Sequence, residues 1–303
     1  MKKRHYAAID IGSNAVRLLI KCVNGVAENP LTKVQLLRVP LRLGEDAFID
    51  GRISKFKARQ LLKLMEAYRA LMDIYDVGRY RACGTSAMRD ASNSRRLVRE
   101  IAQRTGICVE IISGQEEAAL ASVGQLECLL PARGCFLYAD VGGGSTELTL
   151  LVDGRVEVRK SYNIGTVRLL AGVVKQSVLR GFADELAQLG AHYQAQAIIG
   201  TGGNISRLAR MAGHKLKSTS LLSLQRGDLG DLYDQLEALS LEERMARYDL
   251  KPDRADVIVH AARIFLMMAQ ALSAPEIWVP TAGVADGIIE SLYRDDMELP
   301  HEL

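Results

Sequence analysis

Residues 8–14 read Ala-Ile-Asp-Ile-Gly-Ser-Asn, and residues 138–145 read Tyr-Ala-Asp-Val-Gly-Gly-Gly-Ser. In each stretch an apolar strand ends in an aspartate, Asp10 or Asp140, and a Gly-rich turn leads into a second apolar strand. A hairpin dipeptide, Asn-Gly in the first copy and Asp-Gly in the second, closes each second strand. The repeat, with aspartates 130 positions apart (140 − 10), predicts two similar half-molecules that face a shared cleft.

The repeated turns have the chemistry of a phosphate site. Glycine lets the backbone approach an anion closely, so successive N–H groups can form a concave nest around phosphate oxygens. The aspartate at the strand end can hold a Mg²⁺ ion that meets those oxygens. A third Gly-rich turn, Gly200–Gly203, precedes a predicted helix whose N-terminal dipole favours an anion. An ordinary connection also explains any one of these turns, but the set of three favours phosphate binding.

Composition limits the classes of partner. The 303 residues are too many for one ordinary core and predict two domains. Hydrophobic residues make up 48% and charged residues 25%, as in soluble globular proteins. Aromatic residues make up only 5%, so we expect no stacking platform for nucleic acid. The five cysteines lack metal-ligand spacing, and no apolar run has the length of a membrane span. We therefore expect reduced thiols, no membrane partner and a cytoplasmic location.

Strand and helix patterns alternate along the chain, which predicts an α/β protein. The loop Pro131–Gly134 is the best domain boundary. We expect a first domain over residues 1–132, completed by a C-terminal helix at about 283–303, and a second domain over residues 133–282. Long helices are predicted at about 57–75, at about 94–105 with Asn93 as N-cap, and at about 254–272.

Ser113–Ala118 places two adjacent carboxylates, Glu116 and Glu117, at a predicted helix start. Their interaction with the helix dipole, about 0.3–1 kcal/mol each, is one explanation. The functional interpretation is that one of them deprotonates a water molecule that attacks phosphorus. Neighbouring helix residues point about 100° apart, so at most one of the two can do so. Arg89, in the segment Thr85–Asp90, is either a surface residue or a bidentate phosphate ligand, and the same two explanations apply to Arg42 in the segment Arg42–Glu45.

Together and in this order, these motifs resemble the exopolyphosphatase / guanosine pentaphosphate phosphohydrolase family. The resemblance implies an actin-like fold, shared with sugar kinases and heat-shock chaperones, in which two ribonuclease-H-like domains lie around a cleft. Seven stretches carry it: residues 9–14, 42–45, 85–90, 112–118, 140–147, 200–203 and 254–258.

The resemblance also implies roles for single residues. Glu117 is similar to the family's catalytic base, and Asp140 and Glu147 are similar to residues that bind the metal and orient the attacking water. Asp10 is a further expected metal ligand. The implied cofactor is Mg²⁺, with Mn²⁺ as an alternative. The expected phosphate contacts are Ser13, Asn14, Arg89, Gly142, Gly143, Gly144, Ser145, Gly202 and Gly203.

The expected activity is that of an exopolyphosphatase, a phosphoric anhydride hydrolase that releases terminal orthophosphate from inorganic polyphosphate. Long members of the family append a helical C-terminal region that extends the substrate channel and helps them dimerise. This chain stops at Leu303, and we therefore expect a preference for short polyphosphates. A monomer and a homodimer are both left as alternatives. Ala15, Asn204 and Asp253 depart from the family pattern, and this puts fine substrate preference in doubt.

Other functions on the same fold remain alternatives. The first is guanosine pentaphosphate 5′-phosphohydrolase activity in the stringent response, which needs a pocket for the base. The second is a low-turnover sensor that binds guanosine penta- or tetraphosphate, against which Glu117, Asp140 and Glu147 all argue. A kinase or chaperone is disfavoured because a base that activates water, such as Glu117, would hydrolyse ATP without useful transfer of its phosphate.

Overall fold

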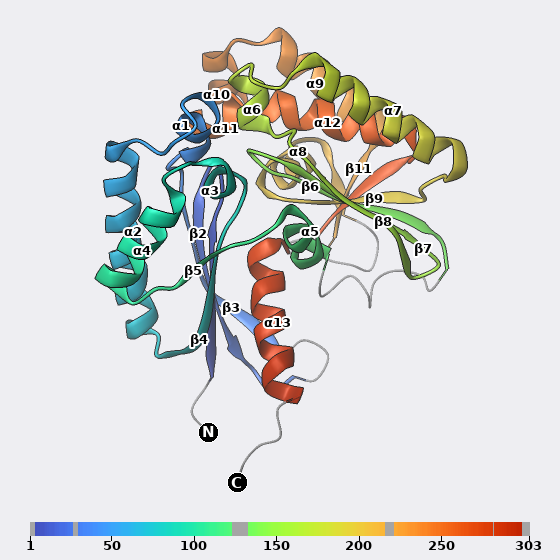
Figure 1. Ribbon diagram of the computed structural model, residues 1–303. Coiled ribbons are helices and arrows are strands. Elements are labelled where there is room, and N and C mark those ends of the chain that lie inside the picture. Colours follow the sequence, from blue (N-terminus) through green and yellow to red (C-terminus); the bar gives the residue numbers. More distant parts are fainter. Residues whose placement is uncertain (1–3, 27–29, 123–132, 216–220, 281, 299–303) are drawn as a thin grey trace. The chain divides into compact units, whose positions relative to one another are not determined.

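The computed structural model describes residues 4–26, 30–122, 133–215, 221–280 and 282–298 (Figure 1). The chain folds into two compact units. Unit 1 comprises residues 1–124 and 284–303, and unit 2 comprises residues 125–283. The domain boundary expected between residues 132 and 133 borders the stretch 123–132, which lies outside the described residues.

Unit 1 is built on a five-stranded sheet in the order β3-β2-β1-β4-β5. The first three strands in this order are antiparallel neighbours, whereas β4 and β5 run parallel to β1. The strands are β1 (His5–Ile11), β2 (Val16–Val23), β3 (Leu31–Val39), β4 (Val77–Gly84) and β5 (Val109–Ile111).

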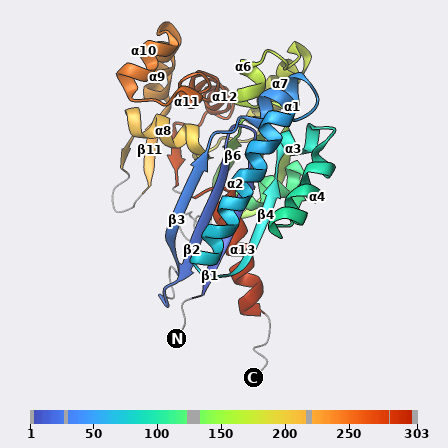
Figure 2. The same ribbon diagram turned by 90° about the vertical axis from the view of Figure 1, so that its left-hand side faces the viewer.

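Helices cover both faces of this sheet (Figures 1 and 2). Successive side chains of a strand point to opposite faces, so Ile9 joins the core beneath α2 while Tyr6 and Ala8 join the core formed with α13. Asp10 shares the parity of Tyr6 and Ala8, which places its carboxylate at the strand end on the α13 face. The helices are α1 (Leu43–Ile49), α2 (Lys55–Ile74), α3 (Ser86–Asp90), α4 (Ser94–Thr105), α5 (Gly114–Ser122) and α13 (Val284–Glu298).

Unit 2 contains a seven-stranded sheet in the order β10-β11-β12-β9-β6-β7-β8. Read from β8 to β12, five of these strands repeat the order and the directions of the unit 1 sheet. The strands are β6 (Cys135–Val141), β7 (Thr146–Val152), β8 (Arg155–Tyr162), β9 (Ala197–Thr201), β10 (His214–Lys215), β11 (Leu222–Gln225) and β12 (Glu276–Val279).

The unit 2 sheet also has two different faces. Leu137 and Ala139 belong to the main core, which includes Phe265 of α12, whereas Phe136 and Tyr138 belong to a smaller cluster on the other face. Asp140 has the parity of that smaller cluster. The helices are α6 (Thr166–Leu170), α7 (Gln176–His192), α8 (Gly203–Ala212), α9 (Arg226–Ala238), α10 (Leu241–Tyr248), α11 (Pro252–Ala255) and α12 (Ile258–Ala271).

The prediction of one continuous helix over about 254–272 is wrong, because the structure has two separate helices there, α11 and α12. Pro252 occupies the first turn of α11, where its missing N–H is tolerated. The Val257 amide then bonds the Arg254 carbonyl only three residues back, at 3.2 Å, and this tighter turn interrupts the α-helical pattern.

Across the described ranges, no helix has both the length and the apolar character needed to cross a membrane.

Candidate functional site

The two Asp hairpins share the same backbone hydrogen bond. In unit 1 the Gly12 amide donates to the Ala15 carbonyl at 3.1 Å, and in unit 2 the Gly142 amide donates to the Ser145 carbonyl at 2.9 Å. Gly12 is required by close approach, because a Cβ there would lie 2.9 Å from the Ala15 carbonyl oxygen. The repeat in the sequence is therefore also a repeat in three dimensions.

Three consecutive carbonyl groups of the unit 2 turn are tied to the segment that begins α6. The bonds run from Thr166 N to Gly142 O (3.0 Å), from Val167 N to Gly143 O (2.7 Å) and from Arg168 Nε to Gly144 O (2.6 Å). In a planar trans peptide the C=O and the following N–H point in opposite directions. The N–H groups of residues 143–145 therefore point away from α6. Such a fixed array of donors is suited to phosphate oxygens.

The unit 2 turn also packs closely against Gly165. A Cβ at this position would lie 2.4 Å from the Gly144 carbonyl carbon and 2.5 Å from the Gly143 carbonyl oxygen. Neither Gly165 nor Arg168 was among the predicted site residues. The only sequence signal for them is a glycine directly before a short helix, and that signal does not say which carbonyl the arginine binds.

In unit 1 the equivalent support comes from the segment between β3 and α1. The Gly44 amide donates to the Ser13 carbonyl at 2.8 Å, and the Arg42 amide donates to the Asn14 carbonyl at 3.0 Å. The Ser13 Oγ accepts a hydrogen bond from the Ala87 amide at 3.2 Å, which links the turn to α3. Residues 42–45, for which the sequence left a surface role and a phosphate contact open, thus support the unit 1 turn through their backbone, as residues 165–168 support the unit 2 turn.

The two hairpins differ in the residue that faces the aspartate across the strand pair. Asp10 faces Arg17, whose Nη1 lies 2.7 Å from Asp10 Oδ2. Asp140 instead faces Glu147, which is only 2% exposed and accepts a hydrogen bond from Ser161 Oγ at 2.8 Å. Like charges directly opposite each other in a sheet are destabilising. The Asp140–Glu147 pair is therefore an arrangement that a bound cation would stabilise.

The oxygen donors of this pair fit Mg²⁺. A Mg²⁺ ion is usually held by one or two carboxylates, with the remaining positions taken by phosphate oxygens and waters. In the part of the chain that the structure describes, no three His, Cys, Asp or Glu side chains are grouped as metal ligands. Asp140 and Glu147 are the two carboxylates that would hold such an ion. Asp10, whose charge is balanced by Arg17, is the least suited of the three predicted ligands.

The third Gly-rich turn lies directly against Asp140. Thr201, at the end of β9, is the parallel-strand partner of Asp140. Gly202 has a φ of 102°, and a Cβ there would lie 2.8 Å from Asp140 Oδ1, so both backbone conformation and space require glycine. Arg254 donates a hydrogen bond to the Gly203 carbonyl, which places a guanidinium at the N-terminus of α8. This cation was part of a quoted motif but had no predicted role.

The two adjacent glutamates of α5, Glu116 and Glu117, differ in burial and in their ion-pair partners. The Glu117 side chain is 10% exposed, and its Oε2 accepts a hydrogen bond from Arg89 Nη1 at 2.8 Å. The same Arg89 nitrogen donates to the Ile112 carbonyl at 3.0 Å. Glu116 is 41% exposed and pairs with Arg81 at 2.5 Å. Of the two, Glu117 is therefore the one held in a buried, fixed position. Arg89 orients Glu117 in this structure, and its phosphate contact stays a prediction.

Cys83 does not have the properties of a nucleophile. It is the parallel-strand partner of Asp10 and is fully buried. Burial raises the pKa of its thiol to about 12, so it is protonated at neutral pH. Cys83 therefore contributes to packing beside the Asp10 hairpin rather than to chemistry.

The predicted residues form two groups, one in each unit. In unit 1, Ser13 is bonded to α3, and α3 carries the arginine that binds Glu117. In unit 2, the strand pair Asp140–Glu147 adjoins both the turn 142–145 and the turn 202–203. The first group thus contains a buried carboxylate, and the second contains an array of backbone donors beside two carboxylates.

Comparison with known proteins identifies relatives along nearly the whole chain. The model of the Ppx/GppA phosphatase family matches residues 22–295. Exopolyphosphatase 2 of Mycobacterium tuberculosis is 29% identical over 94% of this chain and 98% of its own length. Exopolyphosphatase 1 of Mycobacterium bovis is 27% identical over 93% of this chain and 86% of its own length.

Solved structures give the same result. The Ppx/GppA family member from Aquifex aeolicus has a TM-score of 0.79 at 25% identity, over 98% of this chain and 100% of its own. An exopolyphosphatase from Cytophaga hutchinsonii has a TM-score of 0.85 at 24% identity, over 96% of this chain and 98% of its own. The predicted fold class, two α/β units that share the ribonuclease-H-like strand order and directions, is confirmed. The chain belongs to the Ppx/GppA phosphatase family and is a hydrolase.

Proposed function

We propose that this protein is an exopolyphosphatase that releases terminal orthophosphate from inorganic polyphosphate. The observation that carries the proposal is in unit 2. There the turn 142–145 has its carbonyls tied back, so that its N–H groups are presented together, and the Asp140–Glu147 pair adjoins it. The exopolyphosphatases that the chain resembles along most of their length support the choice of substrate.

The proposed chemistry is attack of water on the terminal phosphorus, with cleavage of the bond to the bridging oxygen. Glu117 would accept a proton from the attacking water. The N–H groups of residues 143–145 would hold the phosphoryl oxygens and stabilise the charge that they carry in the transition state. Mg²⁺, with Mn²⁺ as an alternative, would be held by Asp140 and Glu147 and would neutralise phosphate charge.

Guanosine pentaphosphate is the second candidate substrate, since it ends in the same anhydride. Arg254 at the N-terminus of α8 would suit either polyanion. A low-turnover sensor is less well supported, because the Arg89–Glu117 pair fixes a buried carboxylate that binding alone does not need. A cytoplasmic location, a homodimer and a link to the stringent response stay predictions.

The experiment is phosphate release from tripolyphosphate, long-chain polyphosphate and guanosine pentaphosphate, measured side by side with the wild type, Glu117→Gln and Glu116→Gln. Loss of the base should lower kcat by roughly 10²–10⁴-fold with little change in KM. Glu116→Gln should be much milder, because Glu116 is exposed and bound to Arg81. Equal losses of kcat in the two variants would contradict the assignment of Glu117 as the base. Faster hydrolysis of guanosine pentaphosphate than of either polyphosphate would identify the nucleotide as the substrate instead. The same comparison of short and long chains tests the expected preference for short substrates.

A further inference from the structure

Arg42, at the N-terminus of α1, has a left-handed backbone conformation with φ 52° and ψ 45°. This conformation is unfavourable for a residue with a Cβ and persists where the surrounding structure imposes it. It brings the Arg42 amide to the Asn14 carbonyl and the Gly44 amide to the Ser13 carbonyl. The support of the unit 1 turn therefore depends on a strained residue that something else must hold.

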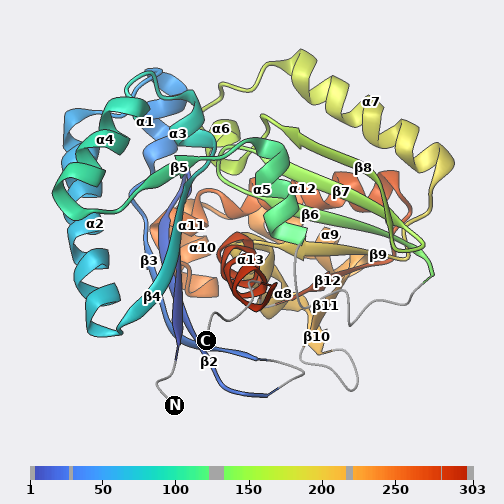
Figure 3. The same ribbon diagram turned by 60° about the horizontal axis from the view of Figure 1, so that its bottom comes forward.

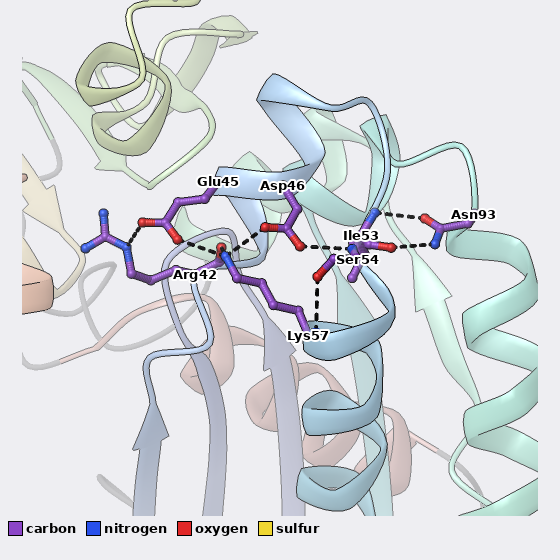
Figure 4. A network of polar contacts seen from close by, with 7 residues as sticks. All are labelled: Arg42, Glu45, Asp46, Ile53, Ser54, Lys57 and Asn93. Carbon is purple, nitrogen blue, oxygen red and sulfur yellow. Dashed lines mark hydrogen bonds and ion pairs between the residues drawn. The ribbon is translucent and has the colours of Figure 1, made fainter.

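The ammonium group of Lys57 holds it (Figure 4). Lys57 Nζ donates to the Arg42 carbonyl oxygen at 2.6 Å and lies 2.8 Å from Glu45 Oε2 and 3.1 Å from Asp46 Oδ1. An ammonium has three donors, and here each of them meets an acceptor from the short segment 42–46. The Lys57 side chain is 14% exposed, so solvent screens these contacts less than it screens surface pairs.

Lys57 itself is fixed by its neighbours. Ser54 caps α2, with its Oγ accepting from the Lys57 amide at 3.2 Å, while the Ser54 amide donates to Asp46 Oδ2 at 2.9 Å. Asn93 bonds both the amide and the carbonyl of Ile53, at 3.0 and 2.8 Å. Burial alone would raise the pKa of Asp46, but hydrogen bonds from Ser54 and Lys57 outweigh it and keep that pKa below its ordinary value. The start of α2 is thus a rigid base from which Lys57 reaches the strained residue.

We propose that Lys57 is a positioning residue of the phosphate site, which fixes the Arg42 carbonyl and thereby keeps the Ser13–Asn14 turn in its substrate-binding conformation. The inference rests on the proposed function, in which that turn contacts phosphate. In unit 2 the corresponding turn is held directly by Arg168. In unit 1 the support is indirect, through the backbone of Arg42, and Lys57 acts without touching the substrate.

The test is a double-mutant cycle. Lys57→Met, Arg42→Gly and the double variant are compared with the wild type in tripolyphosphate hydrolysis and in calorimetric binding of imidodiphosphate, a non-hydrolysable analogue. Lys57→Met should raise KM and the Kd for imidodiphosphate about 10-fold and change kcat less than about 3-fold, because α5 and Glu117 lie outside the network. Glycine adopts the left-handed conformation readily. In the Arg42→Gly background, the same change should therefore cost less than about 3-fold in KM and Kd.

Two controls make the result decisive. Lys63→Met removes an exposed lysine from the same helix and should leave KM, kcat and Kd at wild-type values. Should Lys57→Met fail to fold, the cycle is run with Lys57→Ala, which also removes every donor to the Arg42 carbonyl and favours the helix. A wild-type KM and Kd in the Lys57 variant, or an equal loss in both backgrounds, overturns the inference. A wild type that releases no phosphate refutes the proposed function instead, while the imidodiphosphate cycle still tests Lys57.

Discussion

Replacing Gly287 with alanine tests how closely the proposed base depends on α13. This helix packs beside α5, which carries Glu117 (Figure 3). A Cβ at Gly287 would lie 1.9 Å from the Leu120 carbonyl oxygen and 2.8 Å from its carbonyl carbon. Both are backbone atoms of a helix, so no side-chain rotation relieves the clash.

The size of the displacement follows from these distances. Ordinary contact begins at 3.4 Å, so the two helices must separate by about 1.5 Å (3.4 − 1.9) at this point. Leu120 lies three residues after Glu117, about one helical turn away. Misplacing a catalytic group by about 1 Å can lower the rate roughly 10²-fold. We therefore expect Gly287→Ala to lower kcat about 10²-fold, and overpacking to destabilise unit 1 by about 1–3 kcal/mol.

The assay is steady-state phosphate release from tripolyphosphate, with urea unfolding measured on the same preparations. Gly181→Ala on α7 is the matched control, because a Cβ there meets no atom within 4 Å. It should keep wild-type activity and gain about 0.4–1 kcal/mol, as expected for a glycine replaced inside a helix. A Gly287→Ala protein with wild-type kcat would show that α5 does not depend on this contact, and the coupling argument would fail.

Two further predictions concern the metal and pH. Asp140→Asn should raise the Mg²⁺ concentration for half-maximal activity about 10-fold or more, measured by metal titration, and full wild-type activity in EDTA would contradict a metal site here. Burial alone would raise the pKa of Asp296, but the hydrogen bonds from Tyr6 and Arg79 outweigh it and hold that pKa below its ordinary value of 3.8. A depressed pKa stabilises the fold above pH 3.8 and loses this effect as the pH falls toward the folded-state value. Asp296→Asn should therefore lower the free energy of unfolding by about 1–3 kcal/mol at pH 7, with a gap from wild type that closes below pH 4; a gap independent of pH would contradict the ion-pair explanation.

Local features of the fold could be predicted from the sequence. The Asp hairpins and the Gly-rich turns depend on glycine and on alternating apolar residues close together in the chain, and these patterns are visible without a structure. The separation of Glu116 from Glu117 followed from helix geometry, and the structure puts the first on Arg81 and the second on Arg89.

Contacts between distant segments could not be predicted. The support of the Ser13–Asn14 turn by residues 42–44 joins segments separated by β2 and β3. In the sequence, Arg168 is indistinguishable from any other helical arginine, and only the structure shows its bond to the Gly144 carbonyl. Asn93 occupies the N-cap position of α4, as predicted, but its side chain bonds Ile53 rather than the helix amides. A tertiary partner prevailed over a local preference in that case.

The discontinuous composition of unit 1 has a consequence for the synthesis of the protein. Tyr6 and Asp296 are hydrogen-bonded although they lie 290 positions apart, and Ile288 and Ile289 complete an apolar core that begins with the first strand. On the ribosome, all of residues 125–283 emerge before α13 does, so the second unit to be translated is the first that can finish folding. Until then the nascent first unit carries an uncovered apolar sheet face, a surface that chaperones bind and that promotes aggregation in stalled chains.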